Sequence, residues 1–277
     1  MTARLAVVGD LVEDVVVWPS GPVQRGSDTP CRVFRSRGGS AANVAVAAAA
    51  YVPTRFLGAV GADALGDRLV GELAAAGVEV RVQRSGRTGT VVVLVDVDGE
   101  RTFLPDRAAA NDLGPLAPDD LADVAVLHVP AYGLHGGRTA ATLRDLLRTT
   151  VLQVTLDASS WAVLREIPDL PALLPQVSVL FANEAERREL PEHLPCLVVE
   201  KHGAAPTVVV HPDGRRESFP VEPVQDVRDS TGAGDAFAAG WLSAMMEGLD
   251  LEDRVARAHA LARRVLASPG AGLEESR

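Results

Sequence analysis

Short apolar runs alternate with segments of helical spacing along most of the chain. Residues 5–8 form an apolar run that ends at Gly9, as expected of a buried parallel strand. Similar runs predict strands over 56–60, 124–129, 151–156, 177–181 and 197–201. Helical spacing predicts helices over 40–50, 138–148, 184–190, 235–247 and 252–267, and another that carries Leu69 and Leu73. From Leu121 onward, strand–helix alternation predicts βαβ units and a parallel sheet, and hence an α/β fold.

A second pattern interrupts this alternation in the first half of the chain. Residues 15–18, 31–35, 91–97 and 101–104 alternate in the manner of half-buried strands. Asp98-Gly99 lies between two of them, and this dipeptide is a strong hairpin signal. We predict a small accessory β-sheet from these segments and place the start of its second half near residue 79.

Composition and charge restrict the class of protein. The 277 residues are 47% hydrophobic with a formal net charge of −10, so the chain can bury a sizeable core as one large domain or two small ones. The acidic balance argues against nucleic acid or an anionic membrane as the main partner. No apolar run approaches 18 residues, and Cys31 and Cys196 have no C-x-x-C partner. We expect a cytoplasmic protein with reduced thiols.

The most informative stretch for chemistry is the turn Gly232-Ala233-Gly234 followed by Asp235 and an apolar helix. Glycines before a helix let backbone N–H groups point at an anion, and the helix dipole favours negative charge there. A carboxylate beside a phosphate site suggests a general base. The local pattern is equally compatible with an Asp that only stabilises the helix start. The only lysine is Lys201, and it does not belong to a P-loop motif, so that motif is excluded.

Three other groups of residues are candidates for binding. Asp10, Glu13 and Asp14 follow the first strand, where open α/β sheets place ligands, although a solvated loop would also explain them. The segment 38–43, GGSAAN, opens a helix, and its glycines allow close approach of a ligand; a simple hinge is the alternative. Asn183 and Glu186 form a capping-box pattern, and Glu186 is also a reasonable partner for Mg²⁺.

These segments together resemble the ribokinase family of sugar and nucleoside kinases, also called the phosphofructokinase-B group. Its signatures match 9–14, 38–43, 58–66, 183–186 and 229–235 in the same order. Three positions depart from the family pattern: Trp241 is bulkier than expected, Pro206 replaces a loop glycine, and Asp157 lacks the Asn and Arg that often follow it. We therefore assign Asp157 no role.

The resemblance implies a role for each candidate residue. It makes Asp235 the catalytic base and the amides around Gly232, Ala233 and Gly234 the anion hole. It implies substrate binding by Asp14, Gly38, Gly39, Ser40 and Asn43. It implies nucleotide binding by Asn183, Lys201, Gly203, Gly232 and Gly234, with Glu186 organising Mg²⁺.

The resemblance also implies an architecture and a reaction. We expect residues 1–277 to form a single ribokinase-like domain, a mostly parallel central sheet with helices on both faces, and a β lid formed from about 12–37 and 79–106. The implied reaction moves phosphate from ATP to a hydroxyl of a sugar-like molecule, with Mg²⁺ as cofactor and a monovalent cation such as K⁺ as a further candidate. A homodimer through the lid is implied as well. A nucleoside kinase and a non-catalytic sugar- or nucleotide-binding relative remain the alternatives.

Overall fold

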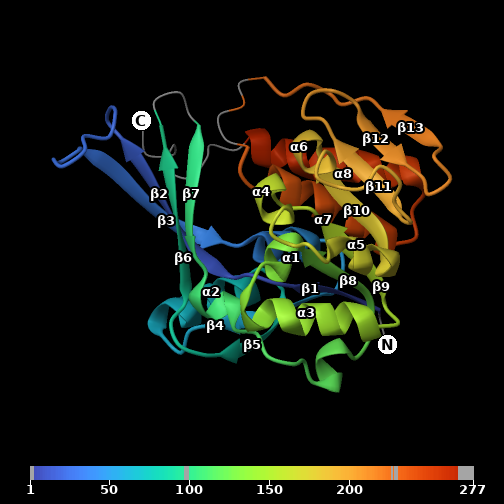
Figure 1. The fold of residues 1–277 in the computed structure, drawn as a ribbon, viewed down its shortest axis with the longest axis horizontal. Helices are drawn as coiled ribbons and strands as arrows, with labels where there is room; N and C mark the ends of the chain where they lie inside the picture. The colour runs from blue at the N-terminus through green and yellow to red at the C-terminus, as the bar shows by residue number, and fades with distance from the viewer. Residues whose placement is uncertain (1–2, 97–99, 226, 228–229, 268–277) are drawn as a thin grey trace.

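A large, mostly parallel sheet forms the body of the protein. The computed structural model describes residues 3–96, 100–225, 227 and 230–267. The strands of the large sheet are β1 (Arg4–Val8), β4 (Thr54–Val60), β5 (Glu79–Arg84), β8 (Val124–Pro130), β9 (Gln153–Asp157), β10 (Val177–Asn183), β11 (Leu197–Lys201), β12 (Thr207–Val210) and β13 (Arg216–Phe219). In the described residues their order is β13-β12-β11-β10-β9-β8-β1-β4-β5 (Figure 1). Neighbours from β11 to β5 are parallel, and only the β12 and β13 edge is antiparallel.

Helices cover both faces of this sheet because side chains of a strand point alternately to opposite sides. Leu5 and Val7 of β1 belong to one apolar core, whereas Ala6 and Val8 belong to the other. The first core is completed by α1 (Ser40–Ala49), α2 (Ala64–Ala75), α7 (Ala233–Met246) and α8 (Leu251–Ala267). The second is completed by α3 (Gly137–Thr149), α4 (Trp161–Leu164) and α5 (Leu170–Leu173). The predicted α/β class with helices on both faces is confirmed.

Trp241, which departs from the family signature, is fully buried in the first core. Its ring packs edge-on against Phe181 of β10, with 5.9 Å between centroids. Small neighbours on α1, such as Ala45 and Ala48, are buried in the same core. The large indole therefore fills space that the alanine-rich helix leaves open.

A separate small sheet consists of β2 (Val12–Pro19), β3 (Cys31–Gly38), β6 (Gly89–Val95) and β7 (Arg101–Asp106). Its order in the described residues is β3-β2-β6-β7, with β2 and β6 parallel and the other pairs antiparallel. Figure 1 shows it standing to one side of the large sheet. Val12, Val91 and Val93 share a small core of its own. The accessory sheet is thus present, while the turn predicted at Asp98-Gly99 lies outside the described residues.

One boundary of the small sheet was predicted wrongly. Residues 79–84 form β5, which pairs in parallel with β4 at the edge of the large sheet. The reason is topological: α2 separates β4 from β5, so the three form a βαβ unit that returns to the same sheet. The contribution of this half to the small sheet therefore begins at Gly89.

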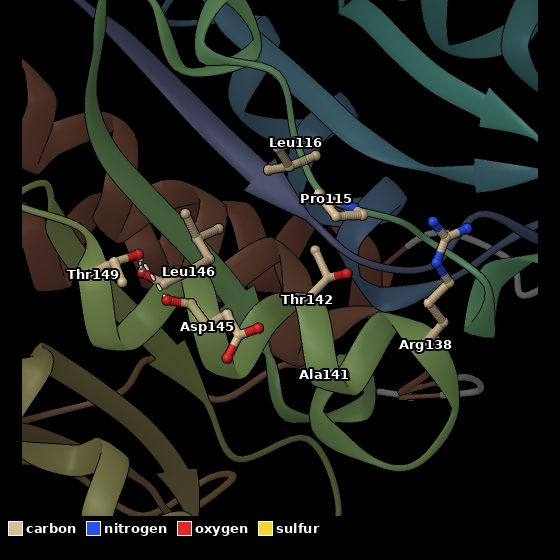
Figure 2. A pocket seen from close by; sticks show the side chains of 8 residues that line it. All are labelled: Pro115, Leu116, Arg138, Ala141, Thr142, Asp145, Leu146 and Thr149. Atoms are coloured by element: carbon tan, nitrogen blue, oxygen red, sulfur yellow. Dashed lines mark hydrogen bonds between the residues drawn. The ribbon is translucent and has the colours of Figure 1, made fainter.

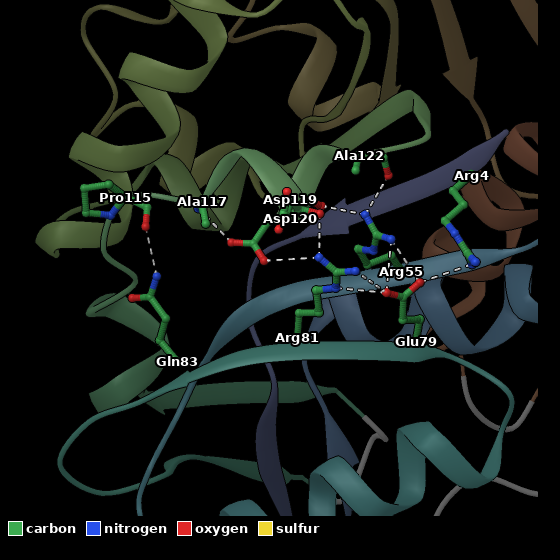
Figure 3. A network of polar contacts seen from close by, with 10 residues as sticks. All are labelled: Arg4, Arg55, Glu79, Arg81, Gln83, Pro115, Ala117, Asp119, Asp120 and Ala122. Atoms are coloured by element: carbon green, nitrogen blue, oxygen red, sulfur yellow. Dashed lines mark hydrogen bonds and ion pairs between the residues drawn. The ribbon is translucent and has the colours of Figure 1, made fainter. Parts of the chain in front are cut away.

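A buried arginine anchors this edge of the large sheet (Figure 3). Arg55 of β4 is 2% exposed, and its NH1 donates to the carbonyls of Asp120 and Ala122 at 2.8 and 2.9 Å. Its NH2 pairs with Glu79 of β5 at 3.0 Å. Arg81 of β5 pairs with the same carboxylate. Each buried charge is thus compensated, as stability requires.

Two other elements differ in length from the sequence prediction. The helix expected near 184–190 is a single turn, α6 (Glu184–Arg187), and the strand expected from residue 151 begins at Gln153. Val151 is 98% exposed, so no burial favours extending the strand to it. Short elements of this kind are set by their neighbours more than by local periodicity.

Candidate active site

The centre of the site is the carboxylate of Asp235, in the first turn of α7. Its Oδ1 accepts a hydrogen bond from Ser40 Oγ at 2.6 Å, and its Oδ2 accepts one from Asn43 Nδ2 at 2.9 Å. Both donors lie at the start of α1, about 190 residues earlier in the chain. Burial raises the pKa of Asp235 to about 7, and these two hydrogen bonds moderate the rise. The carboxylate can therefore gain or lose a proton near neutral pH.

The glycine turn before Asp235 has the geometry expected of an anion site. Gly232 is left-handed, with φ of 77°, and it begins α7 without any side-chain cap. An uncapped helix start leaves backbone N–H groups available to a ligand and carries the positive end of the helix dipole. The turn also lies close to the substrate side: a Cβ placed on Gly232 would be 4.0 Å from Asn43 Nδ2.

The only lysine of the chain reaches this turn from β11. A Cβ placed on Gly234 would be 3.5 Å from Lys201 Nζ, so the ammonium lies beside the start of α7. Lys201 Nζ donates to Asp157 Oδ2 at 2.9 Å. Burial alone would lower the pKa of Lys201, but the carboxylates of Asp157 and Glu186 outweigh it and raise that pKa. The ammonium is therefore charged at physiological pH and can meet a phosphate.

Asp157 is a residue that the sequence prediction missed. It closes β9, while Asn183 and Lys201 close the adjacent β10 and β11, so three neighbouring strands end at one point. Asp157 is buried and is the direct partner of Lys201. The usable signal was its place at the carboxyl end of a parallel strand, where open sheets bind ligands.

Asn183 and Glu186 form the predicted capping box at the start of α6. Glu186 Oε2 accepts from Asn183 N at 2.7 Å, and Glu186 N donates to Asn183 Oδ1 at 2.9 Å. Glu186 Oε1 also accepts from Asn183 Nδ2 at 2.8 Å. Burial and the nearby charge of Asp157 raise the pKa of Glu186. Both carboxylates thus lie on the nucleotide side of Lys201, and Glu186 has a structural function whatever else it does.

The three acids after β1 have different surroundings. Asp10 accepts a hydrogen bond from Ala41 N at the start of α1 and pairs with Arg107. Glu13 is buried and pairs with two arginines. By contrast, no hydrogen bond joins Asp14 to another described residue, and burial, followed by the charge of Asp10, raises its pKa to about 6. Asp14 is therefore the acid of this group with free acceptor atoms for a ligand.

Gly38 and Gly39 are required for the close packing around these acids. A Cβ on Gly38 would lie 2.1 Å from Asp14 Oδ1. Gly39 has φ of 100°, and a Cβ there would lie 2.4 Å from the carbonyl oxygen of Asp10. Any side chain at either position would displace the acids, so glycine is needed for more than a hinge.

Two arginines that the sequence prediction did not name complete this side of the site. Arg107 pairs with Asp10, and its guanidinium lies 4.5 Å above the ring centroid of Tyr132. Arg37 NH1 donates to Asn43 Oδ1 at 2.8 Å, so it is one side chain away from Asp235. No motif marks Arg107, and only the fold brings it to β1 from 97 residues away.

Gly203 is the predicted residue that the structure leaves apart from this cluster. It has φ of 62° in the exposed turn after β11, and no other atom lies within 4 Å of a Cβ placed there. Pro206, in place of the family's second loop glycine, is exposed in the same turn. A nucleotide contact by Gly203 stays a prediction.

The match to a family model covers almost the whole chain. The description "pfkB family carbohydrate kinase" fits residues 2–276. The chain belongs to this family. Its members are kinases that transfer phosphate to an alcohol group and use ATP, so the protein is a phosphotransferase of the sugar and nucleoside kinase class.

Individual relatives of this pfkB-family kinase differ in the substrate that they are named for. The chain is 32% identical to an ATP-dependent ribose-1-phosphate kinase of Halopiger xanaduensis, over 82% of this chain and 79% of the relative. It is 30% identical to an adenosine kinase of Saccharomyces cerevisiae, over 79% and 74%. Among solved structures, a ribokinase of Thermotoga maritima has a TM-score of 0.84 at 22% identity, covering 98% and 95%. The fold is thus ribokinase-like, and the relatives do not select one substrate.

The surface of the kinase also has a hollow that is separate from the site. Figure 2 shows it between α3 and residues 115–116, with Thr142 and Leu146 among its lining. None of the candidate site residues lines it. Across the described residues, none of the helices combines the length and apolar character needed to cross a membrane.

Proposed function

We propose that this protein transfers the γ-phosphoryl group of ATP to a hydroxyl of a sugar or sugar-like molecule, with Asp235 as the general base. The observation that carries the proposal is the position of Asp235. It lies directly after the uncapped turn of α7, is held by Ser40 and Asn43, and has a pKa of about 7. A base with that pKa is well matched to proton transfer near neutral pH.

The proposed step balances as an in-line displacement. The substrate hydroxyl oxygen forms a bond to the γ-phosphorus, the bond to the bridging β–γ oxygen breaks, and the hydroxyl proton passes to Asp235. Asp14, with free acceptor atoms, and Asn43 orient the hydroxyls of the substrate. The amides around Gly232 and Gly234 and the Lys201 ammonium stabilise the charge on the phosphoryl group.

The residues around Lys201 fit Mg²⁺ that is held mainly by phosphate and water. Within the described residues, no group of three His, Cys, Asp or Glu side chains could hold a metal ion. Both oxygens of Glu186 already accept hydrogen bonds from Asn183. Glu186 and Asp157 would therefore accept hydrogen bonds from metal-bound water, and the ion would neutralise the triphosphate charge. The tail expected near a monovalent cation, 268–272, lies outside the described residues.

We further propose that the small sheet closes over the substrate and limits hydrolysis of ATP by water. Its strand β2 carries Asp14, and β3 leads directly into Gly38 and Gly39. Movement of the small sheet would therefore move substrate contacts. We place the reaction in the cytoplasm, which agrees with the unpaired thiols of Cys31 and Cys196.

The test is ATP consumption with Mg²⁺ across pentoses, hexoses, sugar phosphates, sugar acids and nucleosides, for the wild type and for Asp235→Asn. We expect turnover with one substrate, and a kcat lower by about 10²–10⁴-fold in the variant, because general-base catalysis contributes that much. Substrate affinity should hardly change, because Asn can keep the hydrogen bonds to Ser40 and Asn43.

Asp145→Asn is the matched control, because that carboxylate is 82% exposed on α3. It should leave kcat unchanged. An Asp235→Asn variant within threefold of wild type would overturn the base assignment. Nucleotide binding without turnover on any substrate would instead favour a non-catalytic relative. Preference for adenosine over free sugars would favour the nucleoside kinase alternative, which the adenosine kinase relative supports.

A further inference from the structure

Arg37 is a half-buried arginine at the substrate side of the site whose charge has no partner in the described residues. Its one hydrogen bond is the donation from NH1 to Asn43 Oδ1 at 2.8 Å, and no ion pair joins it to a carboxylate. Most arginines in this region are paired: Arg35 and Arg68 with Glu13, and Arg107 with Asp10. The lone guanidinium therefore needs an explanation.

The sheet register makes the absence of a partner more informative. Glu13 of β2 lies directly opposite Arg37 of β3, where a cross-strand ion pair would be expected. However, Glu13 Oε2 pairs with Arg35 at 2.5 Å and Glu13 Oε1 pairs with Arg68 at 2.6 Å. Glu72, the carboxylate with the largest effect on Arg37, also pairs with Arg68. Both nearby acids are therefore already neutralised by other arginines.

Burying a charge without a partner is unfavourable, and a ligand of opposite charge would offset that cost. Burial lowers the pKa of Arg37, which reports the same desolvation. Because Arg37 contacts Asn43, and Asn43 contacts Asp235, an anion on Arg37 would sit on the same molecule as the reacting hydroxyl. A guanidinium binds phosphate and carboxylate groups with two parallel hydrogen bonds.

The two acids near Arg37 do not prevent this arrangement. Burial raises the pKa of Asp14 to about 6 and that of Asp235 to about 7, so both carry less negative charge near neutral pH than ordinary carboxylates. Asp10, the remaining acid, is neutralised by Arg107. The substrate side of the site can therefore accept an anionic group.

We infer that Arg37 selects an anionic sugar, one that carries a phosphate or a carboxylate besides the hydroxyl that is phosphorylated. This inference rests on the proposed kinase reaction and narrows its substrate class. Arg37 is then a specificity residue: it contacts the anion, whereas Asp14 and Asn43 contact hydroxyls. A purely structural Arg37 would support Asn43 and affect neutral and anionic substrates alike, which gives the test its contrast.

The experiment measures dissociation constants by calorimetry with a non-hydrolysable ATP analogue and Mg²⁺ present. The probes are matched pairs: ribose and ribose 1-phosphate, fructose and fructose 6-phosphate, glucose and gluconate, with adenosine as a neutral nucleoside. In the wild type we expect at least one anion to bind tenfold or more tightly than its neutral partner. Arg37→Gln should weaken that anion by about 10–100-fold, the scale of a lost charge-assisted hydrogen bond, and leave neutral probes within threefold.

Arg35→Gln is the matched control, because Arg35 lies two residues earlier on the same face of β3 and is paired with Glu13. It should leave every dissociation constant within threefold, since Glu13 keeps Arg68. The phosphate and carboxylate probes separate the two sources of negative charge.

Three results would overturn the inference: neutral probes that bind as tightly as anions, an Arg37→Gln variant that weakens both kinds equally, or no binding of any anion. The proposed kinase reaction fails in a different way. Anion binding that depends on Arg37, with no ADP formed from ATP, would leave the selectivity intact and reject the kinase reaction for those probes.

Discussion

The Asp235 carboxylate is harder to ionise in the folded protein than in the unfolded chain, because burial raises its pKa from 3.8 to about 7. The folded state therefore binds more protons than the unfolded state between about pH 4 and 7. Stability from this group falls as the pH rises through that window, and the full penalty is present above pH 7. The same property that makes Asp235 a suitable base thus weakens the fold.

We predict that Asp235→Asn raises Tm at pH 8 while it abolishes most activity. The gain should be about 2–4 °C for each kcal/mol of penalty removed, and it should shrink toward zero as the pH falls to 4. Differential scanning calorimetry of both proteins from pH 4 to 8 measures this. A Tm difference that does not vary with pH would contradict the raised pKa. In the wild type, kcat/KM should rise with pH through about 7.

A methyl group at Gly38 should disturb substrate binding. Its Cβ would lie 2.1 Å from Asp14 Oδ1, so Gly38→Ala must displace the carboxylate. We expect KM for the sugar substrate to rise tenfold or more, since hydrogen bonds to charged groups contribute about 1.5–3 kcal/mol. Gly71→Ala is the control, because no other atom lies within 4 Å of a Cβ on that helical residue. Steady-state kinetics with both variants that show equal KM would reject a substrate role for Asp14.

At the scale of elements, the ends of β9, β10 and β11 decide which groups meet the nucleotide. Their parallel order brings Asp157, Asn183 and Lys201 to one edge of the sheet, next to the start of α7. A glycine-rich helix start supplies N–H groups, and the strand ends supply one cation and two carboxylates. Phosphate is therefore handled with a single lysine in a chain of net charge −10.

We predict that Lys201→Met raises KM for ATP tenfold or more and destabilises the protein. The variant leaves Asp157 buried without its partner, which costs up to about 3–5 kcal/mol. Adding Asp157→Asn should restore part of the stability but not the KM. Urea unfolding and ATP kinetics on the two single variants and the double variant measure both effects.

The control for this cycle is Arg188→Gln, which removes an exposed pair with Glu184. It should change the unfolding free energy by less than about 1 kcal/mol. If Lys201→Met alters stability and leaves KM for ATP unchanged, the lysine is structural only.

At the scale of the whole molecule, the small sheet presents apolar side chains to solvent. Val33 of β3 and Phe103 and Leu104 of β7 are each 50% exposed or more. Scattered apolar side chains are common on surfaces, but three on one sheet agree with the expected homodimer through this sheet. The expectation came from the family resemblance and stays a prediction.

We predict a dimer in sedimentation equilibrium, and a shift to monomer for Phe103→Asp, because a charge at a buried interface opposes association. Val151→Asp is the control, since Val151 is 98% exposed at the start of β9 and belongs to another surface. A monomeric mass for the wild type would reject the dimer.

Local patterns in the sequence were enough to predict most elements and the order of the motifs. Apolar runs mark the buried strands because both faces of a parallel sheet are covered, and the glycine turn before Asp235 is legible because only certain residues allow it. Pairings between distant residues are not local properties. The assignment of 79–84 to the large sheet, the partnership of Asp157 with Lys201, and the pairing of Glu13 with Arg35 and Arg68 depend on which elements pack together. The sequence by itself thus determined the family and the candidate base, whereas the tertiary structure decided which charges are neutralised and left Arg37 without a partner in the described residues.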